Sequence, residues 1–390
     1  MREGVVCLKR VKLLHCGDLH LDAPFTSLAC RSGMPEQRRQ ELKRMLASIA
    51  NLAAAEQVDM LLICGDLYEH DYVRKSTFNF IAEQLGKTPG LPVIAIPGNH
   101  DPAAPDSLYS RGEWPENVHI LKKGTDFFEH TPTGTRVYGG MPTAGSTGGA
   151  AVSSADAFSV TSGRINILMH HGTLDMAFNA YAYQPVSSIE LDAWGFDYCA
   201  LGHFHSMIRG AGHSKRIYNA GSPEPLGFDE EGEHGVFIVT IDKNGDGESQ
   251  IGVDFRRIGQ RRFFNLEVQA GGCLTDEQAA SAVASAIEGT GGVGDLYNVT
   301  LQGYVNRSFR VDASYIEELL RDKAFYIRIG DRTIPDYDFG LIAGEPGLRG
   351  LFVKKMLGRA SNAVGEEERR LVMRALYYGL EAIDEGRVCI

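Results

Sequence analysis

The sequence predicts an α/β fold in a chain of more than one domain, and three observations support this. Short apolar runs rich in β-branched residues recur between residues 11 and 241, and most of them stop at Gly, Asp, Asn or His. Helical segments separate the early runs. Beyond about residue 260 the pattern changes to strands alternating with helices, which indicates a smaller α+β unit.

The apolar runs of the first part predict strands that are buried on both faces. They show no alternation of apolar and polar residues, which is typical of a sheet covered on each side. Helical segments at 35–57 and 76–87 lie between the first three runs, so the early order is β-α-β-α-β. The main predicted strands are residues 11–16, 60–64, 91–96, 165–169 and 196–201.

The rest of the first part predicts a hairpin, a loop and two closing strands. Residues 125–130 and 135–140 have hairpin character, and the Gly, Ser and Ala residues of 143–155 predict a flexible loop. Strands are expected at 216–220 and 235–241. They complete a first domain that spans residues 1–259.

Two further units are expected after residue 259. Residues 260–335 form the predicted α+β unit, and residues 336–390 predict a helix, a short loop and a second helix. One apolar stripe on the last helix either packs on the chain's own core or binds a partner, and the sequence leaves both open. The stripe consists of Leu371, Ala375, Tyr378 and Ala382.

The composition predicts a compact protein of the cytoplasm. Hydrophobic residues make up 43% of the 390 residues, and no apolar run is long enough to cross a bilayer. The seven cysteines are scattered and form no CxxC pair, which indicates reduced thiols in an intracellular compartment.

The net charge of −11 counts against a simple nucleic-acid-binding surface, because phosphate contacts need clustered Lys and Arg. Bound divalent cations or a basic partner protein would offset part of this charge. One local basic cluster lies on a predicted helix, where it forms either a solvated face or a contact with DNA. It consists of Arg38, Arg39, Lys43 and Arg44.

Metal-ligand residue types follow five of the predicted strands. The motifs GDLH, GDLYE, PGNHD, HHG and GHFH each come directly after an apolar run. Open α/β sheets place their binding sites beyond the carboxyl ends of the strands, so these motifs are expected to converge on one crevice. The candidate ligands are Asp18, His20, Asp66, Asn99, His170, His203 and His205.

This set of ligand types predicts a two-metal phosphoesterase site. Carboxylate, imidazole and amide ligands without cysteine favour manganese, iron or zinc. A carboxylate such as Asp66 can bridge two ions, which would clamp a phosphate and lower the pKa of a bridging water. The leaving oxygen then needs a proton, and His100, beside Asn99, is the candidate donor.

In this order, the five motifs resemble those of the calcineurin-like metallophosphoesterases. The segments GDLHLDAPF and IYNAGSPEPLGFDEEGEHGVFIV are similar to those of SbcD-like DNA repair exonuclease subunits, and the resemblance covers residues 11–241. It implies a β-sandwich flanked by helices, with a smaller α+β capping domain and a C-terminal helical segment. It also implies two divalent metal ions, with manganese expected, and DNA as the substrate.

The resemblance assigns roles by position. It places Asp66 between two ions and makes His100 the catalytic histidine. Glu69 is expected to orient His100, with His70 as the alternative, and His171 is expected to be structural. One ion would be held by Asp18, His20, Asp66 and His205, and the other by Asp66, Asn99, His170 and His203.

Three functions compete. The resemblance implies a nuclease that forms a homodimer and acts with an SbcC-like coiled-coil ATPase, which the terminal helices would bind. A phosphodiesterase for cyclic nucleotides or other small phosphoesters suits the acidic charge better, but it leaves the unit at 260–335 unexplained. A scaffold that has lost catalysis is disfavoured, because the ligand set is intact.

Overall fold

The computed structural model describes residues 8–28, 33–122, 126–139, 158, 160–176, 183–245 and 247–386. They group into two compact units, one of residues 1–265 with 293–296 and one of residues 266–292 with 297–390. Within the described residues, no helix combines the length and the apolar character that crossing a membrane requires. The predicted loop at 143–155 lies outside the described residues, and the predicted domain limits at 259 and 335 stay predictions.

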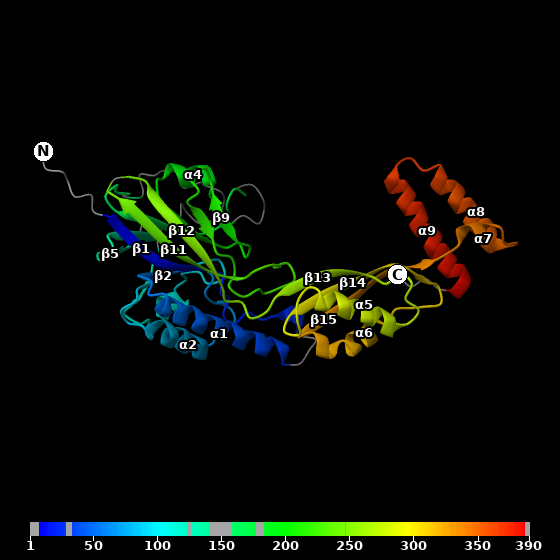
Figure 1. Cartoon of the computed structure of the whole chain (residues 1–390), viewed down its shortest axis with the longest axis horizontal. Coiled ribbons are helices and arrows are strands. Elements are labelled where there is room, and N and C mark those ends of the chain that lie inside the picture. Colours follow the sequence, from blue (N-terminus) through cyan, green and yellow to red (C-terminus); the bar gives the residue numbers. More distant parts are fainter. Residues whose placement is uncertain are drawn as a thin grey trace. The chain divides into compact units, whose positions relative to one another are not determined.

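The first sheet of the larger unit contains the early predicted strands (Figure 1). Its strands β1 to β4 run parallel, whereas β11 pairs antiparallel with β1, and β12 pairs antiparallel with β11. Strand β12 is absent from the predicted elements. The order across this sheet is β12 (Ser249–Arg257), β11 (Gly235–Asn244), β1 (Leu8–Cys16), β2 (Met60–Cys64), β3 (Val93–Ile96) and β4 (Val118–Ile120).

The second sheet of this unit contains the later predicted strands. Strands β6, β7, β8 and β10 run parallel, and antiparallel strands β5 and β9 form its two edges. The predicted hairpin is the β5–β6 pair. The order across this sheet is β5 (Phe127–His130), β6 (Thr135–Gly139), β7 (Ile165–His171), β8 (Tyr198–Gly202), β10 (Ile217–Asn219) and β9 (Ile208–Ala211).

The two sheets pack face to face around one apolar core. Leu13 and Leu62 from the first sheet and Ile167 and Tyr198 from the second are fully buried in it. Every residue of β2 is buried, so the outer face of the first sheet is covered as well. The prediction of a β-sandwich is confirmed.

Helices cover the outer faces of the sandwich. Figure 1 shows α1 and α2 beside the first sheet and α4 beside the second. Leu191 of α4 packs with Leu168 and Trp194 in a core outside the second sheet. Each sheet is therefore covered by helices on its outer face and by the opposite sheet on its inner face, which explains why the apolar runs are continuous. The helical segments are η1 (Thr26–Leu28), α1 (Met34–Ala55), α2 (Lys75–Gly86), α3 (Leu108–Arg111) and α4 (Ser188–Ala193).

The smaller unit contains a three-stranded sheet with two helices, followed by a helical segment. The strand order is β13–β14–β15, and α6 contacts both α5 and β15. Ile342, Val353, Leu376 and Leu380 form the apolar core of the helical segment. The elements are β13 (Phe263–Gln269), α5 (Asp276–Glu288), β14 (Leu296–Asn306), α6 (Ala313–Leu319), η3 (Arg321–Lys323), β15 (Tyr326–Asp336), α7 (Phe339–Ala343), α8 (Leu348–Ser361) and α9 (Glu366–Glu385).

The apolar stripe predicted on the last helix faces outward. Leu371 is 67% exposed and Tyr378 is 39% exposed, and the two alanines of the stripe are exposed as well. Leu376 and Leu380 form the buried face of α9 instead. The interpretation that this stripe packs on the chain's own core is therefore wrong.

Candidate metal centre

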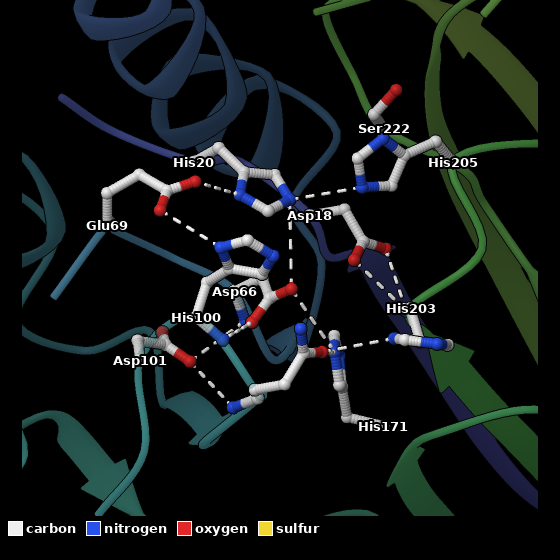
Figure 2. Close-up of polar contacts among 12 residues, drawn as sticks. Asp18, His20, Asp66, Glu69, His100, Asp101, His171, His203, His205 and Ser222 are labelled. Carbon is white, nitrogen blue, oxygen red and sulfur yellow. Dashed lines mark hydrogen bonds and ion pairs between the residues drawn. The ribbon is translucent and has the colours of Figure 1, made fainter. Parts of the chain in front are cut away.

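The candidate ligands gather where five strands of the sandwich end (Figure 2). Asp18 and Asp66 follow β1 and β2, Asn99 follows β3, His171 ends β7, and His203 follows β8. Ligand atoms from three of these strand ends lie within 4.8 Å of one another. The carboxyl ends of these strands therefore bring residues from all five motifs together.

Four of the candidate ligands have positive φ angles, which residues other than glycine rarely adopt. Asp18, His20, Asp66 and His203 have φ angles of 54°, 45°, 50° and 89°. Hydrogen bonds hold the loops in place: the N–H of Asp18 donates to the carbonyl of Gly65 over 3.1 Å, and that of His20 donates to the carbonyl of Asp66 over 2.9 Å. The loops after β1 and β2 are thereby tied to each other.

The strand ends can come this close because a glycine, which has no side chain, lies at two of the contact points. A Cβ on Gly98 would overlap the Asp66 carboxylate. A Cβ on Gly202 would overlap the carbonyl oxygen of Cys64. Only a residue without a side chain allows such close approach of backbone to a neighbour.

The first group of candidate ligands is Asp18, His20 and His205. Nε2 of His20 lies 3.1 Å from Nε2 of His205. On the other side of each ring, Nδ1 of His20 lies 2.7 Å from Glu69, and Nδ1 of His205 lies 2.8 Å from Glu230. When each Nδ1 donates to its carboxylate, both Nε2 lone pairs point at the same space. A cation relieves that repulsion, so the donor set fits a metal ion.

The second group lies around Asp66. Its Oδ2 is 3.3 Å from Nε2 of His171, and Oδ1 of Asn99 lies 2.9 Å from the same nitrogen and 3.1 Å from Nδ1 of His203. Burial opposes ionisation of Asp66, but the hydrogen bond from His171 and the nearby charges of His171 and His20 lower its pKa. Nε2 of His20 lies 3.7 Å from Oδ2. Asp66 is therefore an ionised carboxylate between the two groups.

The structure corrects the prediction for the histidine pair of β7. His170 points away from both groups: its ring is fully buried, and its Nε2 lies 2.9 Å from the carbonyl oxygen of Gln184. Successive side chains of a strand point to opposite faces. Met169 lies in the core between the sheets, whereas Leu168 lies in the core near α4. His171 shares the inner face with Met169, and it is the histidine that reaches the candidate site.

Glu69 lies between two histidines. Its Oε1 is 2.7 Å from Nδ1 of His20, and its Oε2 is 2.9 Å from Nδ1 of His100. Burial opposes ionisation of Glu69, but the hydrogen bonds from the two rings lower its pKa to about 2. The hydrogen bond to Glu69 in turn raises the pKa of His100. The alternative partner, His70, lies 3.7 Å from Asp106 instead.

Asp101 holds the loops that carry these ligands. Its carboxylate accepts hydrogen bonds from the N–H groups of Gly98, Asp66 and Leu67 over 2.6, 3.0 and 2.7 Å, and from the Tyr109 hydroxyl over 2.6 Å. Burial raises its pKa to about 7. The sequence reasoning missed this residue, although it is the last letter of the PGNHD motif.

The basic cluster of α1 is paired with acids. Arg38 is fully buried and contacts Glu41 over 2.6 Å and Glu224 over 2.7 Å, and Arg39 contacts Glu36 over 2.8 Å. The other two cations of the cluster lie 3.9 and 3.7 Å from carboxylates. The prediction of a solvated helix face is therefore wrong for Arg38, and the cluster offers little unpaired positive charge to DNA.

Comparison with known proteins places this site in context. Residues 11–207 match the family model described as calcineurin-like phosphoesterase. The chain is 30% identical over 261 residues to an uncharacterized metallophosphoesterase, YhaO, of Bacillus subtilis (strain 168), covering 64% of this chain and 61% of that protein.

Two further relatives have names that refer to nucleic acid. The DNA double-strand break repair protein Mre11 of Methanopyrus kandleri is 26% identical over 259 residues, covering 60% of this chain and 55% of that protein. The SbcD component of the nuclease SbcCD of Escherichia coli (strain K12) is 25% identical over 297 residues, covering 61% of this chain and 67% of that protein. The chain thus spans about three fifths of the length of the first two relatives.

Proposed function

Because this chain belongs to the calcineurin-like phosphoesterase family, we propose that it is a metal-dependent phosphodiesterase that hydrolyses DNA. The observation that carries the proposal is the position of Asp66 between two donor groups: its Oδ2 lies 3.7 Å from Nε2 of His20 and 3.3 Å from Nε2 of His171. Similarity to a DNA repair protein and to a nuclease component supports DNA as the substrate.

The donor groups suit two divalent cations, and manganese, iron or zinc would accept such a mixture of oxygen and nitrogen ligands. When bound, the ions would polarise the phosphate and activate water for in-line attack. His171 replaces His170 in this assignment because of its place on β7. One ion would be held by Asp18, His20, Asp66 and His205, and the other by Asp66, Asn99, His171 and His203.

His100 supplies the proton that the leaving oxygen needs. Glu69 binds its Nδ1, so Nε2 is the nitrogen available to a substrate. The side chain is 46% exposed, which lets a phosphodiester reach it. Because Glu69 raises the pKa of His100, the ring keeps its proton to higher pH than an isolated histidine does.

A phosphodiesterase for cyclic nucleotides or other small phosphoesters is the second candidate, and the charge distribution favours it. The net charge is −11, and the basic cluster of α1 is paired with acids. A pocket of about 280 Å³ beside His205 is lined by Glu230, Glu231 and Glu233. These acids repel a long polyanion more strongly than a small ester that touches only the metal ions.

An SbcC-like coiled-coil ATPase is the proposed partner. Leu348 and Leu351 of α8 and Leu371 of α9 are more than half exposed, and apolar surface of this kind suits a partner helix. The similarity to a protein named as part of a nuclease supports an assembly. A basic surface on such a partner would offset part of the net charge of this chain. Its binding and the expected homodimer would both appear as added mass in light scattering.

The test is manganese-dependent cleavage of linear double-stranded DNA, a cyclic nucleotide and bis(p-nitrophenyl) phosphate. Wild type is compared with Asp66→Asn, and with Asp71→Asn as a matched control, because Asp71 is exposed and lies in the loop just after Asp66. We expect wild type and the control to cleave DNA and the chromogenic ester, and Asp66→Asn to cleave neither.

Other outcomes would contradict parts of the proposal. Cleavage of small esters without cleavage of DNA, even after the coiled-coil ATPase is added, would contradict the nuclease assignment and favour the second candidate. No metal-dependent cleavage of any phosphodiester by wild type would contradict the proposed chemistry itself.

A further inference from the structure

Glu230 lies behind the metal centre, on the far side of His205 from the other ligands. Its Oε1 is 2.8 Å from Nδ1 of His205, while Nε2 of the same ring lies 3.1 Å from His20. Figure 2 shows His205 between His20 and Ser222, with its ring directed at His20. Glu230 therefore contacts a candidate ligand through the nitrogen that does not face the site.

The carboxylate of Glu230 is itself held rigidly. Its Oε2 accepts hydrogen bonds from the Ser222 hydroxyl over 2.8 Å and from the N–H of Leu226 over 3.2 Å. Only 8% of the residue is exposed. With these two donors on one oxygen, the other oxygen is directed at His205, and rotation of the carboxylate would break both bonds.

The surrounding loop is fixed by a second set of contacts. The N–H of Ser222 donates to the carbonyl of His205 over 3.1 Å, so the backbone of the ligand is held beside its side chain. Nε2 of His234 lies 3.0 Å from the carbonyl oxygen of Glu230, and Nδ1 of His234 lies 2.8 Å from that of Ser222. Residues 222–234 thus form one hydrogen-bonded support for the ring of His205.

We propose that Glu230 is a positioning residue that fixes His205 with its proton on Nδ1 and presents Nε2 to one of the two metal ions. The inference rests on the proposed function and adds a residue to it. A ligating histidine whose outer nitrogen is bound by a carboxylate is held in one tautomer and one orientation, and losing such a partner weakens metal binding by about 10- to 100-fold. Glu69 contacts two histidines, the candidate ligand His20 and the proposed proton donor His100. Glu230, in contrast, contacts the candidate ligand His205.

The test is calorimetric titration of the metal-free full chain with Mn²⁺, together with the electron paramagnetic resonance spectrum of the bound ions. The variants are Glu230→Ala and Glu230→Gln, with Glu233→Gln as the control. Glu233 lines the same pocket but is exposed. Melting of the metal-free protein shows whether each variant is folded.

We expect Glu230→Ala to bind one ion as wild type does and the other about 10- to 100-fold more weakly. At intermediate Mn²⁺ its spectrum then shows a single ion, where wild type shows a coupled pair. Glu230→Gln is expected to lose less, because the amide oxygen still accepts a hydrogen bond from Nδ1. Glu233→Gln is expected to match wild type.

Unchanged affinity for both ions in Glu230→Ala would overturn the inference, and so would equal weakening of both ions, which indicates general loss of structure. If Glu230→Ala does not fold, Ser222→Ala decides: it is expected to weaken the same ion a few-fold, and unaltered binding would overturn the inference. If wild type binds two ions and cleaves phosphodiesters while the variants match it, the inference alone fails. If wild type binds no Mn²⁺, the proposed function fails first.

Discussion

Replacing Glu69 with Gln tests whether one carboxylate serves both a metal ligand and the proton donor. In the structure its two oxygens lie 2.7 Å from Nδ1 of His20 and 2.9 Å from Nδ1 of His100. A glutamine has one oxygen that can accept and one NH₂ group that only donates. The variant can therefore satisfy one of the two rings, and the other loses its acceptor.

The size of the effect follows from these two contacts. Loss of the bond to His20 removes the outer support of a ligand, and we expect about 10- to 100-fold weaker Mn²⁺ binding. Loss of the negative charge lowers the pKa of His100, which Glu69 raises in wild type. His100 then gives up its proton at lower pH, so the fall in kcat on the basic side should move to lower pH. General acid catalysis is worth about 10²- to 10⁴-fold, which bounds the loss.

The assay is kcat for a short DNA duplex as a function of pH, at Mn²⁺ concentrations that saturate each protein. Glu113→Gln, which changes the same charge at an exposed position, is the control. In a His100→Ala background, Glu69→Gln should add little to the loss of kcat, because the two residues act as one unit. A basic limb that stays at the wild-type pH, or full additivity of the two substitutions, would refute this role for Glu69.

The remaining predictions concern five other perturbations. His171→Ala should weaken binding of one Mn²⁺ by more than about 100-fold, whereas His170→Ala should keep both ions but lower the free energy of unfolding by about 2 to 4 kcal/mol, as calorimetry and denaturation would show. The reverse pattern would contradict the assignment of His171, and not His170, as the metal ligand on β7. His100→Ala should slow cleavage of DNA far more than cleavage of bis(p-nitrophenyl) phosphate, whose leaving group needs no proton; equal losses would contradict a role as acid. Burial lowers the pKa of His15 from 6.5 to about 4. Between these pH values His15 is protonated in the unfolded chain but neutral in the folded chain, so the free energy of unfolding falls as pH drops from about 6.5 toward 4. His15→Gln should therefore shrink the loss of unfolding free energy between pH 7 and pH 5 by about 2 kcal/mol in urea titrations. An unchanged loss would contradict the burial argument. Removing metal with a chelator should lower the melting temperature, because ions that bind only the folded state stabilise it, and an unchanged melting temperature would argue against bound ions.

Most of the strands and the convergence of the candidate ligands could be predicted, because the ligand types follow directly after apolar runs. Asp18 and Asp66 come two residues after strands that are buried on both faces. Parallel neighbours bring such positions together whatever the intervening helices contain. Local sequence was therefore enough to predict the cluster.

The choice between His170 and His171 could not be made in this way. All seven residues of β7 are buried, so no polar alternation reveals which side chains face the second sheet. The face is set by contacts of Met169 with the first sheet, which no local pattern reports. The resemblance to the family assigns the first histidine, His170, as the ligand. In the structure the alternation of side chains along the strand directs the second histidine, His171, to the site.

Supporting contacts were missed for a related reason. Glu230 reaches His205 across 25 positions of sequence, and Asp101 reaches Asp66 across 35. Such pairs depend on how the loops fold over one another. The sequence alone does not distinguish these two acids from the many other Asp and Glu residues of the chain. Arg38 was misjudged in the same way, since its partner Glu224 lies 186 positions away.

The left-handed backbone at Asp18, His20, Asp66 and His203 has a consequence for how this protein can change. A side chain held in that region costs about 1 to 2 kcal/mol per residue relative to glycine. Relief of backbone strain and ligand identity are therefore opposed at these four positions. A library of variants selected only for heat resistance in metal-free medium is expected to accumulate glycine at His203, becoming harder to melt while losing the capacity to bind metal. Glycine is not expected at Asp18 or Asp66, because each carboxylate accepts a backbone N–H that would lose its partner. Selection that alternates heating with a requirement for bound manganese would have to find its stabilising changes elsewhere in the sandwich.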